Sequence, residues 1–108
     1  MDRRDAVTTY YEALDAGAYD RLSGLLTPAF VQHRPDRTLE GRERFVAFMR
    51  DERPTTDTTH AVDAVYDDVA EVAVRGRLLD ADGETLVSFV DVFVFEGEKM
   101  TTLWTYTR

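Results

Sequence analysis

The second half of the chain contains four segments rich in β-branched and aromatic residues, and they restrict the fold more than any other feature. Within these segments, apolar and polar residues alternate in stretches, as they do in half-buried β-strands. Short breaks that contain aspartate, glutamate or glycine separate consecutive segments, which is typical of hairpin turns. The sequence therefore predicts an antiparallel meander of four strands, over residues 59–66, 69–79, 84–95 and 99–107.

The third of these strands contains a carboxylate in an apolar setting. Its odd positions are Thr85, Val87, Phe89, Asp91, Phe93 and Phe95, and its even positions are Leu86, Ser88, Val90, Val92 and Val94. Both faces are largely apolar, so we expect a central strand that is covered on each side. Burial of the Asp91 carboxylate among aromatic residues is unfavourable and should raise its pKa. We interpret Asp91 as part of the floor of a ligand pocket.

The first half of the chain predicts three helices and one strand. Apolar residues recur at helical spacing over residues 3–16, 18–26 and 41–53, and residues 29–34 alternate as a strand does. Prolines are expected to end the second helix, the strand and the third helix, at Pro28, Pro35 and Pro54. The predicted fold class is α+β, with the three helices packed on one face of a strongly curved antiparallel sheet and an apolar cavity between them.

Composition narrows the classes of function. A chain of 108 residues with no linker or repeat predicts a single domain over residues 1–108. The net charge of −8 disfavours binding to nucleic acid phosphates. The chain contains no cysteine, no signal-peptide pattern and no apolar stretch long enough to span a membrane, so a cytoplasmic protein is expected.

Three runs of residues together resemble one known group of proteins. They are YYEALDAGAYDRLSGLLTPAFVQHRP from Tyr10, LEGRERFVAFM from Leu39 and VDVFVFEGEKMTTLWTY from Val90. They resemble the SnoaL-like and ketosteroid isomerase-like proteins of the nuclear transport factor 2-like superfamily. The resemblance extends from about Tyr10 to Tyr106 and implies a cystatin-like α+β cone. The superfamily includes isomerases, cyclases, dehydratases, hydrolases and proteins without enzymatic activity, so the fold alone does not define a reaction.

The resemblance implies roles for three residues. Tyr10 falls where ketosteroid isomerase has its oxyanion-binding tyrosine, and Asp91 falls where it has the protonated aspartic acid that shares this task. His33 falls at the position of the general-base aspartate, so this chain has an imidazole in place of a carboxylate. SnoaL-like aldol cyclases also place an acid/base residue in this cavity, and Asp91 is the best candidate for it. The predicted catalytic residues are therefore Asp91, His33 and Tyr10.

Further residues are candidates for the pocket wall. The predicted ligand-binding set, chosen for aromatic or apolar character and strand position, is Phe89, Phe93, Trp104, Tyr11, Val31 and His60. For several of them a structural role is the alternative. His33 shares a strand face with Ala29 and Val31, and could equally be a buried histidine bonded to a backbone carbonyl. Tyr11 is the alternative to Tyr10 as the hydrogen-bond partner of Asp91.

The sequence does not decide which surface the aromatic face of the last strand forms. Trp104 and Tyr106 share it with Met100 and Thr102, and they form either the pocket wall or a dimer surface. The apolar outer face of the sheet predicts a homodimer formed sheet to sheet.

No cofactor or metal is predicted, because the sequence contains no glycine-rich phosphate loop, no nucleophile elbow and no closely spaced histidines. Three hypotheses remain. The first is a cofactor-independent enzyme acting on a small hydrophobic metabolite with a carbonyl group or an acidic C–H. The second is a module that binds such a metabolite without converting it. The third is a protein-interaction dimer whose cavity has no function.

Overall fold

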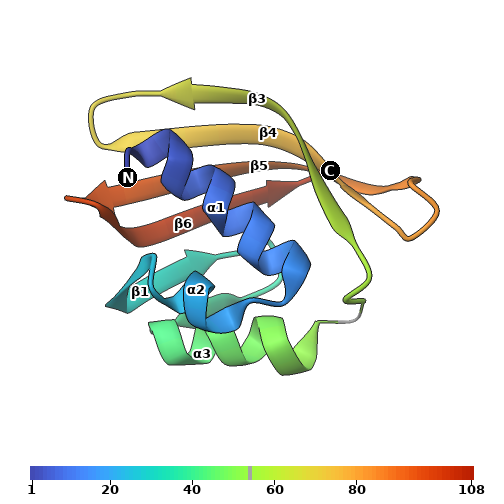
Figure 1. The fold of residues 1–108 in the computed structure, drawn as a ribbon, viewed down its shortest axis with the longest axis horizontal. Coiled ribbons are helices and arrows are strands. Elements are labelled where there is room, and N and C mark those ends of the chain that lie inside the picture. The colour runs from blue at the N-terminus through green and yellow to red at the C-terminus, as the bar shows by residue number, and fades with distance from the viewer. Residues whose placement is uncertain (54) are drawn as a thin grey trace.

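A computed structural model describes residues 1–53 and 55–108 and confirms the α+β class (Figure 1). The described residues form three α-helices, one π-helical turn and six strands. The helical elements are α1 (Arg3–Ala16), α2 (Tyr19–Ser23), α3 (Arg42–Ala47) and the turn η1 (Phe48–Glu52). The strands are β1 (Leu26–His33), β2 (Thr38–Glu40), β3 (Thr59–Asp67), β4 (Glu71–Leu79), β5 (Thr85–Glu96) and β6 (Lys99–Thr107).

All six strands belong to one curved sheet with the order β2-β1-β6-β5-β4-β3. The predicted meander is confirmed, since β3, β4, β5 and β6 pair antiparallel in chain order. The sheet extends further than the meander, because β1 joins the free edge of β6 in parallel and β2 then pairs with β1. This crossover brings the end of β1 beside the centre of the sheet.

The helices lie on one face of the sheet (Figure 1). Helix α1 agrees with its predicted bounds, with Asp2 as the N-cap and Gly17, at φ 68°, as the left-handed C-cap. Its buried side chains Tyr10 and Tyr11 meet the inward-facing Phe93 of β5, with ring centroids 5.0 and 5.9 Å away. The odd positions of β5 from Phe89 to Phe95 are all buried, so the predicted inner face of this strand is confirmed.

Two helices are shorter than predicted. Helix α2 ends at Ser23, and Pro28 lies within β1 instead of ending a helix. Pro28 occupies the part of β1 where its register against β6 shifts, between Leu26 and Val31, and a residue without an N–H is tolerated at such an irregularity. The third predicted helix is divided into α3 and η1, which ends at Glu52. Pro54, predicted to end it, lies outside the described residues.

Close packing of three strands surrounds Gly76 in β4. A Cβ atom at Gly76 would lie 2.5 Å from the carbonyl oxygen of Ala61 and 2.7 Å from the ring of Phe89. The register of β3 against β4 also shifts nearby, between Val62 and Ala64. Glycine therefore lets the backbone of β3 approach the Phe89 ring, which forms part of the site described below. None of the described helices is both long and apolar enough to cross a lipid bilayer.

Candidate functional site

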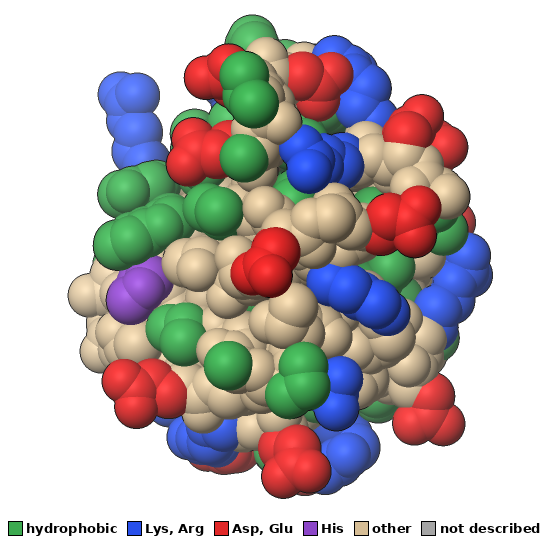
Figure 2. Space-filling model, turned by 90° about the vertical axis from the view of Figure 1, so that its left-hand side faces the viewer, with side chains coloured by type: hydrophobic (Ala, Val, Ile, Leu, Met, Phe, Trp, Pro, Cys, Tyr) green, Lys and Arg blue, Asp and Glu red, His purple; other side chains and the backbone are tan. Residues whose placement is uncertain are grey.

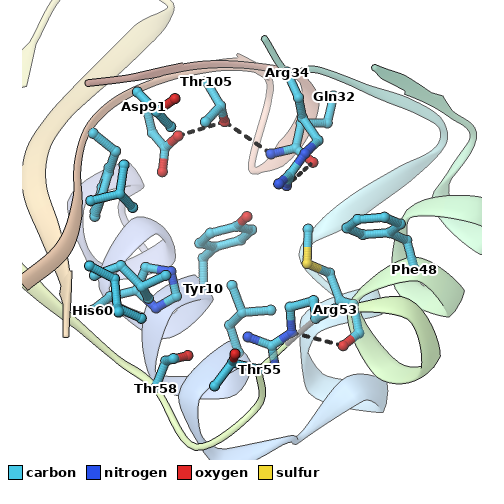
Figure 3. Close-up of a pocket in the computed structure, with 17 residues that line it drawn as sticks. Tyr10, Gln32, Arg34, Phe48, Arg53, Thr55, Thr58, His60, Asp91 and Thr105 are labelled. Atoms are coloured by element: carbon cyan, nitrogen blue, oxygen red, sulfur yellow. Dashed lines mark hydrogen bonds between the residues drawn. The ribbon is translucent and has the colours of Figure 1, made fainter. Parts of the chain in front are cut away.

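A pocket of about 300 Å³ opens between the helices and the inner face of the sheet (Figure 3). It lies at one end of the sheet, where β1 and β6 end and β3 begins. Its wall combines aromatic and aliphatic side chains with a set of polar ones. The polar lining residues that concern its chemistry are Tyr10, Gln32, Arg34, Arg53, Thr55, Thr58, His60, Asp91 and Thr105.

Asp91 is a buried carboxyl group in this wall, with 5% of its surface exposed. Each oxygen accepts one hydrogen bond: Oδ2 from the Tyr11 hydroxyl and Oδ1 from the Thr105 hydroxyl, both at 2.6 Å. Burial raises the pKa of Asp91, and the hydrogen bonds from Thr105 and Tyr11 only partly oppose this effect. The carboxyl is thereby fixed in orientation, and its pKa lies above that of an ordinary aspartate.

The bond from Thr105 ends a hydrogen-bond chain with a single direction. Arginine can only donate, so the Arg34 guanidinium, 3.5 Å away, requires the Gln32 amide oxygen to face it. The Gln32 amide nitrogen then donates to Thr105 Oγ1 over 2.9 Å, and the Thr105 hydroxyl hydrogen is directed to Asp91. Every donor in the chain thus points towards Asp91, which suits a carboxylate that accepts a proton from a ligand.

The two neighbouring tyrosines of α1 have different positions. Tyr11 lies behind the wall and holds Asp91, whereas Tyr10 lines the pocket. Figure 3 shows the Tyr10 hydroxyl directed into the space between Asp91 and Arg34. Burial, followed by the charge of Asp91, raises the pKa of Tyr10, so its hydroxyl stays protonated and available as a donor. The prediction that Tyr10 bonds to Asp91 is wrong, because Tyr11 occupies that place.

A second acid/base group lies at the start of β3. The Asp15 carboxylate of α1 is 2.6 Å from His60 Nδ1 and also accepts the His60 backbone N–H at 3.0 Å. A carboxylate can only accept, so the Nδ1 atom carries the proton and the Nε2 atom of this pocket-lining ring is left for a ligand. The His60–Asp15 pair therefore has the arrangement of an oriented proton-transfer group.

The predicted site residues separate into three groups. Asp91, Tyr10, Phe89 and His60 line the pocket together. Tyr11 and Phe93 are buried behind it, where they support Tyr10 and Asp91. The remaining three do not reach the pocket; they are His33, Val31 and Trp104.

His33 and Val31 lie on the opposite face of the sheet because of the alternation along β1. Phe30 is fully buried, so Phe30 and Gln32 occupy the inward positions of β1. The alternate positions, Val31 and His33, face outward. The His33 ring stacks on that of Trp104, with 4.0 Å between centroids. The expectation that His33 shares the pocket with Asp91 is therefore wrong, and Gln32 with Arg34 occupies that part of the wall.

Trp104 faces outward because β6 contains one extra residue. Val94 pairs with Thr102 while Phe95 pairs with Met100, so Thr101 has no partner in the register. The bulge lets both Met100 and Leu103 face the core and reverses the alternation that would put Trp104 beside Met100. Trp104 and Tyr106 are consequently exposed on the outer face, and Thr105 takes the inward place beside Asp91.

Several residues of the site lacked a sequence signal that could identify them. Thr105 and Asp15 are identified as site residues only by their hydrogen bonds to Asp91 and His60 in the structure. Gln32 could have been found, because it alternates with Phe30, the largest apolar residue of its strand. No group of three or more histidine, aspartate or glutamate side chains converges within the described ranges, so this part of the chain offers no evident set of metal ligands.

The comparison with family models establishes the family. The model of the SnoaL-like domain matches residues 7–103, nearly the whole chain, and the protein therefore belongs to the SnoaL-like family. This finding confirms the resemblance read from the sequence. No match was found among the curated proteins.

Solved structures confirm the fold across the whole chain. A nuclear transport factor 2-like protein of unknown function from Cytophaga hutchinsonii superposes with a TM-score of 0.86 at 19% identity, covering 100% of this chain and 91% of its own. A candidate ketosteroid isomerase from Kribbella flavida superposes with a TM-score of 0.86 at 20% identity, covering 97% of this chain and 76% of its own. A candidate polyketide cyclase from Sinorhizobium meliloti superposes with a TM-score of 0.83 at 16% identity, and the match covers 94% of each chain.

Proposed function

We propose that this protein binds a small, largely apolar molecule with a carbonyl group and moves a proton on it without a cofactor. The observation that carries the proposal is the Asp91 carboxyl, buried in the wall of a pocket of about 300 Å³ and fixed by one donor on each oxygen. The names of the structural neighbours, a candidate ketosteroid isomerase and a candidate polyketide cyclase, support an isomerase or cyclase class of reaction.

The proposed reaction begins with proton abstraction next to the carbonyl. The Asp91 carboxylate accepts the proton from the carbon, and the electron pair of the C–H bond moves into an enolate. A base with a raised pKa suits this step, because proton transfer is most efficient when the pKa of the base lies near the working pH. The enolate then takes back a proton at another carbon, as in an isomerisation, or attacks a second carbonyl, as in an aldol-type ring closure.

Tyr10 is suited to stabilise the enolate oxygen. Its hydroxyl faces the pocket, and its raised pKa keeps it a neutral donor (Figure 3). A fixed donor directed at the position where negative charge develops is among the larger contributions to catalysis. His60, held by Asp15, would accept a proton at its unprotonated Nε2 atom and return it to the substrate or to solvent.

The proposal is tested by exchange of carbon-bound hydrogen in D₂O. The probe is 2-tetralone, a bicyclic ketone whose hydrogens next to the carbonyl are acidic, and NMR follows their replacement by deuterium. We expect the unaltered protein to accelerate exchange and Asp91→Asn to reduce this acceleration by roughly 10²- to 10⁴-fold, the usual contribution of a general base. The matched control is Asp63→Asn, because Asp63 pairs with Arg77 on the surface.

Two outcomes would contradict the enzymatic proposal in different ways. If 2-tetralone binds but neither protein exchanges its hydrogens faster than buffer, the pocket is a binding module without proton transfer. If Asp91→Asn retains the full acceleration, the base is a different group.

We also propose that two copies pair through the outer face of the sheet. The outer row, defined as His33, Trp104, Val92, Ala73 and Tyr66, crosses five strands in register and contains no acidic side chain. Trp104 is 41% and Tyr66 is 55% exposed. Figure 2, which views the end of the molecule with the β5–β6 turn, shows hydrophobic side chains gathered beside a histidine at its left edge, while charges of both signs are scattered over the rest of the view.

Light scattering coupled to size exclusion tests the pairing. We expect a dimer for the unaltered protein and a monomer for Trp104→Glu, because a charge in the row must be desolvated on pairing. Val69→Glu is the matched control, since Val69 is 89% exposed in the turn after β3, outside the row. A monomer in the unaltered protein would overturn the proposal.

A further inference from the structure

The end of the pocket opposite Asp91 has its own polar chemistry (Figure 3). Arg53, Thr55 and Thr58 lie together there, across the open space from the Asp91 carboxyl. None of the three takes part in the hydrogen-bond chain that orients Asp91. These residues therefore form a second cluster, which the proposed proton transfer does not use.

Thr58 contains a buried hydroxyl without a partner. The residue is 4% exposed and lines the pocket, and its Oγ1 atom makes no hydrogen bond to any described residue. Leaving a buried hydroxyl unpaired is unfavourable, and such groups are rare in folded proteins. A polar atom of a bound molecule would satisfy it.

Arg53 provides a cation at the same end of the pocket. Its Nε atom donates to the Met49 carbonyl at 2.9 Å and its Nη2 atom to the Tyr19 hydroxyl at 3.4 Å, which fixes the guanidinium plane. No ion pair involving Arg53 occurs among the described residues. Since a guanidinium has five N–H donors, several remain for a ligand in the planar arrangement that matches a carboxylate.

The charge of the pocket differs in sign from that of the chain. The whole protein has a net charge of −8, yet the pocket wall contains two arginines, Arg34 and Arg53, and one carboxyl, Asp91. Arg34 already pairs with Asp36, so an anionic group would be attracted to the Arg53 end, which gives a ligand a single orientation.

We propose that the ligand is a small apolar carboxylic acid whose carboxylate is bound by Arg53 and Thr58, with its reactive carbon directed to Asp91. The inference rests on the proposed function, because it assumes that the pocket takes a small molecule. It adds the substrate class and the orientation. A carboxylate at this end supplies the acceptor that the Thr58 hydroxyl lacks and the anion that the Arg53 guanidinium lacks.

Two probes of the same shape test the inference, 2-naphthoate and its uncharged amide, 2-naphthamide. Isothermal calorimetry measures the binding of each to the full chain. We expect the acid to bind about 10- to 100-fold more tightly than the amide, the range for a charge-assisted hydrogen-bonded pair. Arg53→Gln should abolish this preference by weakening the binding of the acid alone, and Arg53→Lys should retain part of it.

Two further variants complete the design. Thr58→Val has the same shape without the hydroxyl, and we expect it to weaken the binding of the acid by about threefold to tenfold while the protein stays folded. Arg50→Gln is the matched control for charge, because Arg50 lies in the turn η1 just before Arg53 but pairs with the exposed Asp51. Its effect on both probes should be negligible.

Each contrary result has a separate meaning. Equal binding of acid and amide overturns the carboxylate inference and leaves the ligand pocket intact. A preference for the acid that survives in Arg53→Gln overturns the assignment to Arg53. If neither probe binds, the inference fails together with the proposed ligand pocket. If the protein exchanges the hydrogens of 2-tetralone but shows no preference for the acid, the proposed reaction stands and only the carboxylate inference fails.

Discussion

The two faces of the sheet both present polar and aromatic side chains, but those on the inner face are enclosed and those on the outer face are accessible to water. On the inner face at the ends of β1 and β6, Gln32 and Thr105 are enclosed and connected by hydrogen bonds to Asp91. On the outer face of the same two strands, His33 stacks on the exposed ring of Trp104. His33 is the more reactive residue type, yet it lies where water has access. Enclosure and fixed hydrogen-bond direction, rather than residue type, therefore distinguish the candidate site.

The largest expected difference between the two faces comes from removing each of the two histidines in turn. His60→Ala removes the imidazole held by Asp15 on the inner side, and we expect deuterium exchange into 2-tetralone to slow by about 10²-fold, the lower end for a general acid or base. His33→Ala removes the imidazole on the outer side and should leave the rate unchanged. Equal losses in both variants would contradict the distinction between the two faces.

The next effect concerns packing behind the pocket. Gly76→Ala places a methyl group against the Ala61 carbonyl and the Phe89 ring, so we expect a loss of about 2 kcal/mol in the free energy of unfolding. Arg75→Ala, at the adjacent exposed position that faces outward, should change it by less than about 0.5 kcal/mol. Urea unfolding measures both. A neutral result for Gly76→Ala would show that the strands can separate there without penalty.

The smallest effect is a dependence of stability on pH. Burial raises the folded-state pKa of Asp91 above its unfolded value, so the folded state holds the proton more tightly. The stability from this group is complete below about pH 4 and is lost as the pH rises through the raised pKa. Asp91→Asn has no such titration and should be more stable than the unaltered protein at pH 7.5, by about 1 kcal/mol, or roughly 4–8 °C in Tm.

The pH dependence of this difference provides the control. As the pH falls below the raised pKa of Asp91, the side chain at position 91 becomes uncharged in both proteins, and the gain in stability of Asp91→Asn should decrease. Thermal unfolding at pH 4, 6 and 7.5 is sufficient to follow it. A difference of the same size at every pH would attribute the effect to altered hydrogen bonds with Tyr11 and Thr105 instead of to charge.

Local patterns predicted those elements that depend on few distant contacts. Helix α1 and the four meander strands follow from periodicity, caps and short turns. The short α2, the strand β2 and the placement of Pro28 within β1 did not follow, because β1 is held by parallel pairing with β6 at the far end of the chain. Pairing between segments so distant in sequence overrides local helix propensity.

The sequence by itself determined that Asp91 faces inward, because alternation in β5 is unbroken from Phe89 to Phe95. Only the tertiary structure decided which groups surround it. A bulge at Thr101 selected Thr105 over Trp104, and the burial of Phe30 selected Gln32 over His33. The physical reason is the two-residue period of a strand: a shift of one residue sends every later side chain to the other face, and contacts with distant strands set that shift.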